Sequence, residues 1–259
     1  YIKSLDKQAF KRWNVIVLLV ESLRIDQLLI TGGAREVMPN LEKLSLRGRV
    51  FSNNYTQASH SNYADLCPLT SHYPLRGRSH HLYPKNASYP RLLIYDVLKS
   101  LGYDTAIFSS QNENWGNMLN YLETKNLDKL LHSETYKGQT YIHHNDHGFA
   151  NWVKGGKRSG KIDDRYTVKE AIEWIDSRGV NPFFIYMNLQ NSHVPYVVPS
   201  DYPRKFGPEK INFTIAFGRF PKDKIEVVKN RYADSLNYVD FQIGKLIQHL
   251  KNNNLWEKT

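Results

Sequence analysis

Three short runs of apolar residues constrain the fold of this chain most strongly. They span residues 14–20, 105–108 and 182–187. Each run is too short for a helix and nearly free of polar residues, which is typical of a strand buried on both faces of a parallel sheet. Helical patterns alternate with these runs. We therefore predict an α/β fold with a doubly wound, mostly parallel central sheet and helices on both faces.

Four other segments have the pattern of helices, at residues 38–48, 90–101, 167–177 and 225–250. The last has the most regular apolar stripe. Its members are Ile225, Val228, Tyr232, Leu236, Val239, Ile243, Leu246 and Leu250. Residues 111–160, by contrast, are rich in Asn, Gly, His and Lys and have weak periodicity. Such a stretch is long for a structureless connection, so we expect a functional loop region there.

The chain has 259 residues, with 35 Lys and Arg against 25 Asp and Glu and a formal charge of +10. This size suits one α/β domain with a full core. The charge suits a polyanionic partner, although a merely basic soluble protein has the same balance. No helix-turn-helix, zinc-finger or RNA-binding sheet signature is present, so we expect no nucleic-acid partner. The single cysteine, Cys67, excludes an internal disulfide.

Polar residues follow two of the apolar runs directly, at the strand ends where open α/β sheets bind ligands. Glu21 follows the first run, and His193 follows the third in an Asn-Ser-His-Val-Pro-Tyr turn. Ser61 lies in a polar segment between the first and the second run. Each residue also has a simpler interpretation, as a helix cap, a solvated acid or a histidine packed under a turn.

Several motifs, taken together and in order, resemble the alkaline phosphatase/sulfatase superfamily. They are the run ending in Glu21-Ser-Leu-Arg, Met38-Pro-Asn-Leu, Ser61 with the later Tyr73-Pro74, Leu101-Gly-Tyr-Asp-Thr-Ala, Pro182-Phe-Phe-Ile-Tyr, His193-Val-Pro-Tyr and Tyr238-Val-Asp240. The resemblance is closest to the metal-dependent phosphotransferases that include lipoteichoic acid synthases. It implies a hydrolase or transferase of phosphate esters, less readily of sulfate esters, that forms a covalent intermediate on a serine.

The resemblance also implies roles for individual residues. Glu21 and Ser61 would bind one divalent ion (Mn²⁺, Mg²⁺ or Zn²⁺), and Ser61 would be the nucleophile. Coordination to a cation lowers the pKa of a hydroxyl and makes it a better nucleophile. His193 would serve the substrate as a general acid or by a hydrogen bond. Trp115 and Asn117 fall at substrate-contacting positions, where the phosphotransferases have tryptophan and arginine.

Some positions depart from the superfamily pattern. The sulfatase maturation motif, x-Pro-x-Arg after the nucleophile, is missing after Ser61. The sulfatase lysine and histidine fall at Ser110 and Asn112, and the second acidic ligand falls at Ser22. We therefore expect phosphate rather than sulfate chemistry. Asn117 in place of arginine also argues against a phosphoglycerol substrate.

In the superfamily, an Asp-His-Gly at the end of a strand after the long helix completes the metal site. Here the motif occurs only as Asp146-His147-Gly148, within the predicted loop region, and we interpret it as a coincidental match. The neighbouring His143 and His144 could still contact substrate or bind a metal. We therefore predict that residues 1–259 form a single catalytic domain of a longer protein and lack the C-terminal part that completes the metal site.

We expect an exported domain at the cell envelope, held at the membrane by segments outside this chain. The basic residues Lys3, Lys7, Lys11 and Arg12 suit a juxtamembrane start. The longest apolar run, Val15–Val20, is too short to span a bilayer. The expected partner is an anionic phosphoester or sulfate ester linked to a lipid or polymer. The alternative is a catalytically degenerate domain that binds an anionic polymer or a partner protein.

Overall fold

The computed structural model describes residues 12–73, 83–85, 91–143, 150–154, 160–213, 215 and 219–259. The central sheet has the strand order β1-β7-β2-β3, and each neighbouring pair is parallel. Its strands are β1 (Val15–Val20), β7 (Phe183–Leu189), β2 (Asp104–Ser109) and β3 (Lys129–Leu131). Because the order in space differs from the order in sequence, helical crossovers connect the strands. The predicted doubly wound parallel sheet is confirmed.

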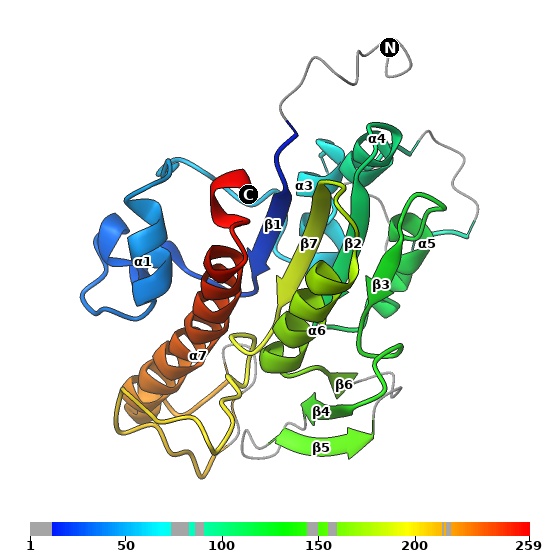
Figure 1. Ribbon diagram of the computed structural model, residues 1–259. Helices are drawn as coiled ribbons and strands as arrows, with labels where there is room; N and C mark the ends of the chain where they lie inside the picture. Colours follow the sequence, from blue (N-terminus) through cyan, green and yellow to red (C-terminus); the bar gives the residue numbers. More distant parts are fainter. Residues whose placement is uncertain are drawn as a thin grey trace.

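Helices cover both faces of this sheet (Figure 1). The helices are α1 (Pro39–Ser45), α2 (Ser61–Ala64), α3 (Cys67–Thr70), α4 (Ile94–Ser100), α5 (Leu119–Leu122), α6 (Asp164–Ser177) and α7 (Ile225–Asn252). Short 3₁₀ helices lie at Ile25–Gln27, Leu29–Thr31, Trp115–Asn117 (η5), Lys222–Lys224 and Trp256–Lys258 (η7). The four helices predicted from sequence correspond to α1, α4, α6 and α7.

The side chains of β7 alternate between two separate cores. Phe183, Ile185 and Met187 pack in the cluster that contains residues of α6 and α7. Phe184 and Tyr186 pack in the cluster that contains residues of α3, α4 and α5. Since β7 is buried along its whole length, it is the central strand that the apolar run 182–187 predicts.

The prediction of a loop region at residues 111–160 is wrong for much of that stretch. It contains η5, α5, β3 and the strands of a second, antiparallel sheet. This sheet has the order β5-β4-β6, with β4 at Gln139–His143, β5 at Ala150–Lys154 and β6 at Gly160–Lys161. These strands have only two to five residues and lie in a stretch rich in Asn, Gly, His and Lys, so their periodicity was too weak to be visible in the sequence. Asp146, His147, Gly148 and His144 lie outside the described residues.

The apolar stripe of α7 is buried as predicted, with one correction at its start. Ile225 is 44% exposed, whereas Val228, Tyr232, Leu236, Val239, Ile243, Leu246 and Leu250 are buried. Ile225 is the first residue of α7 and precedes the part of the helix that packs on the core. Its place in the periodic pattern therefore does not bury it. Among the described residues, no helix is both long and apolar enough to cross a membrane.

A buried carboxylate on α7 fixes α1 to the core. Asp240 accepts backbone N–H groups from Asn40 at 2.9 Å and Leu41 at 2.8 Å, and the Asn40 side-chain amide at 2.9 Å. These two backbone donors belong to the first turn of α1, where a helix has no internal acceptors. Asp240 therefore supplies the N-terminal cap that the α1 sequence itself lacks.

Replacing Asp240 with alanine should lower the free energy of unfolding by about 2–3 kcal/mol, because it leaves buried donors without an acceptor. Urea unfolding followed by circular dichroism measures this change. Asp223→Ala, at an exposed acid in the 3₁₀ helix before α7, is the matched control and should leave the value nearly unchanged. Equal effects of the two variants would contradict the capping role.

Candidate functional site

The candidate site lies at the edge of the sheet where β1 and β7 both end. Val20 pairs with Leu189 in register, and the Glu21 backbone N–H donates to the Leu189 carbonyl at 3.0 Å. The next residues, Glu21 and Gln190, therefore leave the sheet side by side. Open α/β sheets bind ligands at this edge.

The Glu21 carboxylate is the centre of this polar group. Its Oε2 atom accepts the Ser61 hydroxyl at 3.3 Å and the Gln190 side-chain amide at 3.3 Å. Ser22 donates to Oε1 at 3.3 Å. The backbone here is also held in place, since the Ser192 hydroxyl donates to the Glu21 carbonyl at 2.5 Å. The structure thus brings together Glu21 and Ser61, which are 40 positions apart in sequence.

Ser61 starts the short helix α2, and the same helix ends at a second acid. Asp65 is 6% exposed and accepts the Gln111 amide at 3.3 Å. Burial, followed by the nearby charges of Glu113 and Glu21, raises the pKa of Asp65 well above its ordinary value. The sequence reasoning did not identify Asp65. Its spacing of four residues from Ser61, one helical turn, was the available signal.

Two further charged groups at this site were also missed. Glu113 is almost fully buried in the loop after β2, and burial raises its pKa. Lys161 on β6 donates a hydrogen bond to Gln190 Oε1. Burial lowers the pKa of Lys161 to about 8, while the charges of Glu21, Asp164, Asp65 and Glu113 act in the opposite direction. No local sequence signal marks Lys161, because tertiary pairing alone places it here.

His193 lies in the turn that follows β7, and it is half-buried. Its pKa is lowered to about 4, first by burial and then by the positive charge of Lys161. The imidazole is therefore neutral near pH 7. Its Nδ1 atom lies 2.7 Å from the Val194 carbonyl oxygen, so in the neutral ring Nδ1 carries the proton and Nε2 is the acceptor.

Trp115 and Asn117 occupy η5 at the rim of the site. Both are exposed, with Trp115 at 50%. Gly116 between them has a φ of +62°, and a Cβ atom there would lie 3.0 Å from the Asn62 Cβ. This close approach sets η5 against the residue next to Ser61. Among the residues that the structure describes, no hydrogen bond joins Trp115 or Asn117 to Glu21 or Ser61, so their substrate contacts stay predictions.

The distance between Glu21 Oε2 and Ser61 Oγ suits two ligands of one divalent ion. Two oxygens at adjacent corners of an octahedron around Mg²⁺ are about 3 Å apart, given bond lengths of about 2.1 Å. Glu21 Oε2 and Ser61 Oγ are 3.3 Å apart, which is close to that separation. Within the described part of the chain, no three His, Cys, Asp or Glu side chains are arranged to hold an ion. Glu21 and Ser61 therefore supply part of a ligand set.

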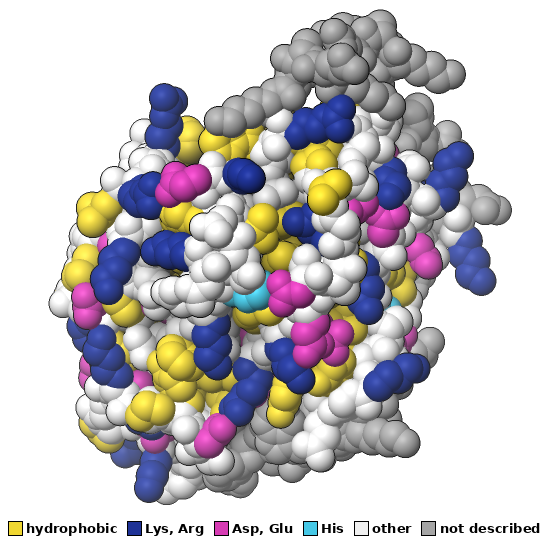
Figure 2. All heavy atoms as spheres, in the orientation of Figure 1, with side chains coloured by type: hydrophobic (Ala, Val, Ile, Leu, Met, Phe, Trp, Pro, Cys, Tyr) yellow, Lys and Arg dark blue, Asp and Glu magenta, His cyan; other side chains and the backbone are white. Residues whose placement is uncertain are grey.

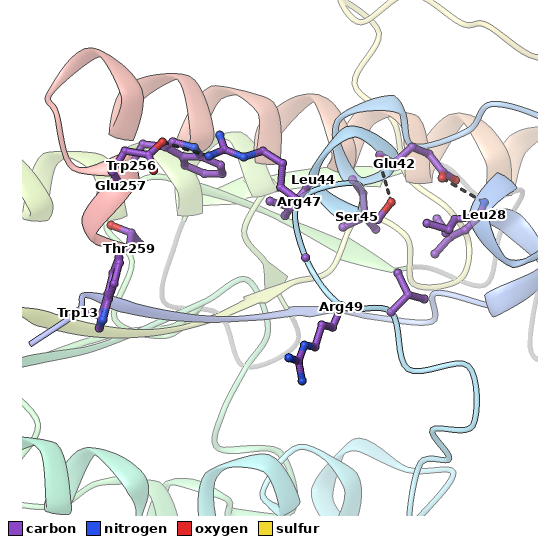
Figure 3. A pocket seen from close by; sticks show the side chains of 14 residues that line it. Trp13, Leu28, Glu42, Leu44, Ser45, Arg47, Arg49, Trp256, Glu257 and Thr259 are labelled. Carbon is purple, nitrogen blue, oxygen red and sulfur yellow. Dashed lines mark hydrogen bonds and ion pairs between the residues drawn. The ribbon is translucent and has the colours of Figure 1, made fainter. Parts of the chain in front are cut away.

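The site opens into a cleft of about 810 Å³. Glu21, Ser61 and Asp65 lie in it, together with residues of the 54–73 segment such as His60 and Tyr73. A second groove, of about 490 Å³, lies between α1 and η7 (Figure 3). Trp13 and Trp256 line it, and Arg47 pairs with Glu257 across it at 3.2 Å. The groove extends from Trp13, before β1, to Leu28, after it, and shares no lining residue with the cleft at Glu21.

The lowered pKa of His193 predicts acid sensitivity. An unfolded histidine binds a proton near its ordinary value of 6.5, whereas folded His193 binds one only near pH 4. Between these values the unfolded state binds more protons, so the free energy of unfolding falls as the pH falls. The loss attributable to His193 is up to about 3 kcal/mol. Urea unfolding between pH 7 and pH 4 should show a flatter dependence for His193→Gln than for the unchanged chain.

His72→Gln, at an exposed histidine of the same cleft, is the control and should leave the pH dependence unchanged. A His193→Gln variant that loses as much stability in acid as the unchanged chain would show that His193 is protonated normally in the folded state.

Comparisons with known proteins identify the family and the fold of this chain. A family model described as Sulfatase matches residues 13–259. Iduronate 2-sulfatase of Mus musculus is 21% identical over 95% of this chain and 52% of that enzyme. A Vibrio parahaemolyticus protein of the alkaline phosphatase superfamily superposes with a TM-score of 0.68 at 21% identity, over 96% of this chain and 53% of that one.

The lipoteichoic acid synthase LtaP of Listeria monocytogenes superposes with a TM-score of 0.67 at 19% identity, over 96% of this chain and 55% of that one. The chain thus spans about half the length of each of these relatives. At such identities the structural likenesses establish the fold, which is that of the alkaline phosphatase superfamily. Because the family match covers nearly the whole sequence, the chain belongs to the sulfatase family.

Proposed function

We propose that this chain carries the active site of a metal-dependent hydrolase or transferase that acts on phosphate esters with Ser61 as nucleophile. The observation that supports the proposal is the contact between the Ser61 hydroxyl and the Glu21 carboxylate at the end of β1. A divalent ion bound by these two oxygens would lower the pKa of the hydroxyl and offset charge on the substrate. Ser61 alone would be a poor nucleophile near neutral pH.

The charge balance of the site favours a bound cation. The site has three acids near one lysine, and the charges of Glu21, Asp65 and Glu113 all act to raise the pKa of Lys161. Repulsion among the acids contributes to the raised pKa of Asp65. An anionic phosphoester would be repelled by this group unless a cation lies between them. The surface as a whole is basic, and Lys and Arg side chains are spread over the face shown in Figure 2. This surface favours the approach of an anionic substrate.

The proposed reaction has two steps. In the first, a bond forms between Ser61 Oγ and phosphorus as the serine proton passes to solvent, and the bond to the leaving oxygen breaks as that oxygen takes a proton from solvent. In the second, water or an acceptor alcohol attacks phosphorus, the bond between phosphorus and Ser61 Oγ breaks, and Oγ takes up a proton again. A neutral His193 whose Nε2 is an acceptor suits the second step, because it can take the proton of the attacking water or alcohol.

Phosphate is preferred to sulfate in this proposal. Ser110 and Asn112 carry no charge where sulfatases have lysine and histidine, and Ser61 lacks the maturation motif. The Ser110 hydroxyl donates to Asp164 at 2.6 Å inside the core, so its role here is structural. We propose a lipid- or polymer-linked phosphoester at the exported side of the cell envelope, with Trp115 and Asn117 at the substrate rim. The name of LtaP, a lipoteichoic acid synthase, supports that substrate class.

We also propose that another strand completes the sheet beside β1. Among the described residues β1 pairs only with β7, so one edge of an apolar six-residue strand carries unpaired backbone groups. β1 is half-buried throughout, whereas β7 is fully buried. Long apolar edges of this kind are normally covered. A strand here would end beside Glu21 and could supply the remaining metal ligands.

The test is phosphodiester turnover by the whole natural protein with Mn²⁺ present. Ser61→Ala should reduce hydrolysis of bis(p-nitrophenyl) phosphate by about 10³-fold or more, since it removes the nucleophile. Mass spectrometry of the quenched unchanged enzyme should find a p-nitrophenyl phosphoryl group on Ser61, because only one p-nitrophenolate leaves in the first step. Ser59→Ala, two positions away and exposed, is the matched control and should keep nearly full activity.

Two results would contradict the proposal. Full activity of Ser61→Ala would exclude Ser61 as the nucleophile. Absence of turnover in the unchanged protein, together with binding of teichoic acid, would favour the alternative of a degenerate domain that binds an anionic polymer. Faster hydrolysis of p-nitrophenyl sulfate than of the phosphodiester would reverse the preference for phosphate.

A further inference from the structure

Lys161 reaches the candidate site from the smaller sheet. On β6 it lies opposite Tyr141 of β4. The next residue, Ile162, donates its backbone N–H to the Ser110 carbonyl at 2.8 Å, directly after β2. The main chain around Lys161 is therefore fixed between the two sheets. Its side chain is held at the carboxyl ends of the central strands, whereas the side chain of a surface lysine is not fixed in this way.

The ammonium group of Lys161 has one described partner. It donates to Gln190 Oε1, a neutral amide oxygen. Although Glu21, Asp164, Asp65 and Glu113 act on its charge, no carboxylate of the described residues forms an ion pair with it. A half-buried ammonium that has three donors and one neutral protein acceptor is costly in a structure of this kind. Such a group points to an anionic ligand that is bound during function.

Gln190 connects Lys161 to the nucleophile. Its amide nitrogen donates to Glu21 Oε2 at 3.3 Å and to Asn188 Oδ1 at 2.8 Å, while its oxygen accepts from Lys161. The same Glu21 oxygen accepts from Ser61. Lys161 is thus one side chain away from the Glu21–Ser61 pair, and its charge also acts on His193. An anion bonded to Ser61 Oγ would lie within this ring of residues.

We propose that Lys161 binds the anionic group on which Ser61 acts, with its ammonium donating to a non-bridging oxygen of a tetrahedral phosphate. This inference deepens the proposed function and rests on it for the place of the phosphate. It assigns to a residue of β6 the positive charge that Ser110 and Asn112 do not supply. A lysine suits this role because its ammonium is a compact charge that binds phosphate from one side.

Binding of inorganic phosphate tests the proposal without turnover. Phosphate affinity is measured by isothermal titration, with and without Mn²⁺, for the unchanged chain, Lys161→Met and Lys161→Arg. Lys161→Met should weaken phosphate binding about tenfold or more, since a charge-assisted hydrogen bond is lost. Lys161→Arg should keep most of the affinity. Lys245→Met, at an exposed lysine of α7, is the control and should bind phosphate like the unchanged chain.

A second measurement needs no variant. Acetylation of lysines in the unchanged chain, followed by mass spectrometry, should be slower at Lys161 when phosphate is present and unchanged at Lys245. Phosphate binding that survives Lys161→Met, or Lys161 acetylation that phosphate does not slow, would overturn the proposal. Lys161→Met that binds Mn²⁺ more tightly and phosphate equally would overturn it too, because Lys161 would then be only a counterion for the acids.

Failure of this proposal can be distinguished from failure of the proposed function. Ser61→Ala should still bind phosphate, because Lys161 is intact in that variant. If Ser61→Ala kept its phosphodiesterase activity while Lys161→Met lost phosphate binding, the nucleophile would be wrong and the anion site would stand.

Discussion

The in-register pairing of β1 with β7 is the constraint on which the candidate site depends. Because Val20 lies opposite Leu189, the two strands end together, and the first polar residue after each one meets the other. A shift by one residue would turn the side chains of β1 to the opposite face of the sheet. It would separate Glu21 from Gln190 and from the start of α2. The geometry of a few side chains thus follows from the apolar packing of two strands.

The polar groups at this edge destabilise the fold by themselves. Asp65, Glu113 and Lys161 are taken out of water without a full set of opposite charges, and burial shifts the pKa of each toward its neutral form. By contrast, Asp240 and Asp164 satisfy buried backbone donors, Asp164 those of Gln190 and Asn191 at 2.8 and 2.9 Å. The two kinds of buried acid have different origins. One kind stabilises helices and turns, and the other kind belongs to the site that we propose binds a ligand.

Much of the fold could be predicted because its strongest signals are local. The apolar runs of β1 and β7 and the long stripe of α7 are continuous in the sequence, and burial follows from them directly. The second sheet could not be predicted in this way, because β4, β5 and β6 are short, have no clear apolar pattern and become strands only by pairing with each other. Glu21 and His193 could be identified because each directly follows an apolar run.

The sequence by itself determined a parallel sheet with the strands β1, β2 and β7, the helices α1, α4, α6 and α7, and the polar residues that follow β1 and β7. Only the tertiary structure decided which residues surround Ser61. The only sequence signal of Asp65 is its distance of one helical turn from Ser61, Glu113 has no distinctive spacing, and Lys161 lies 100 positions from Ser61 in a two-residue strand. The periodicity of apolar residues indicates which face of a helix or strand is buried. The meeting of side chains from separate elements depends on strand order and register, which are set by the packing of the whole chain.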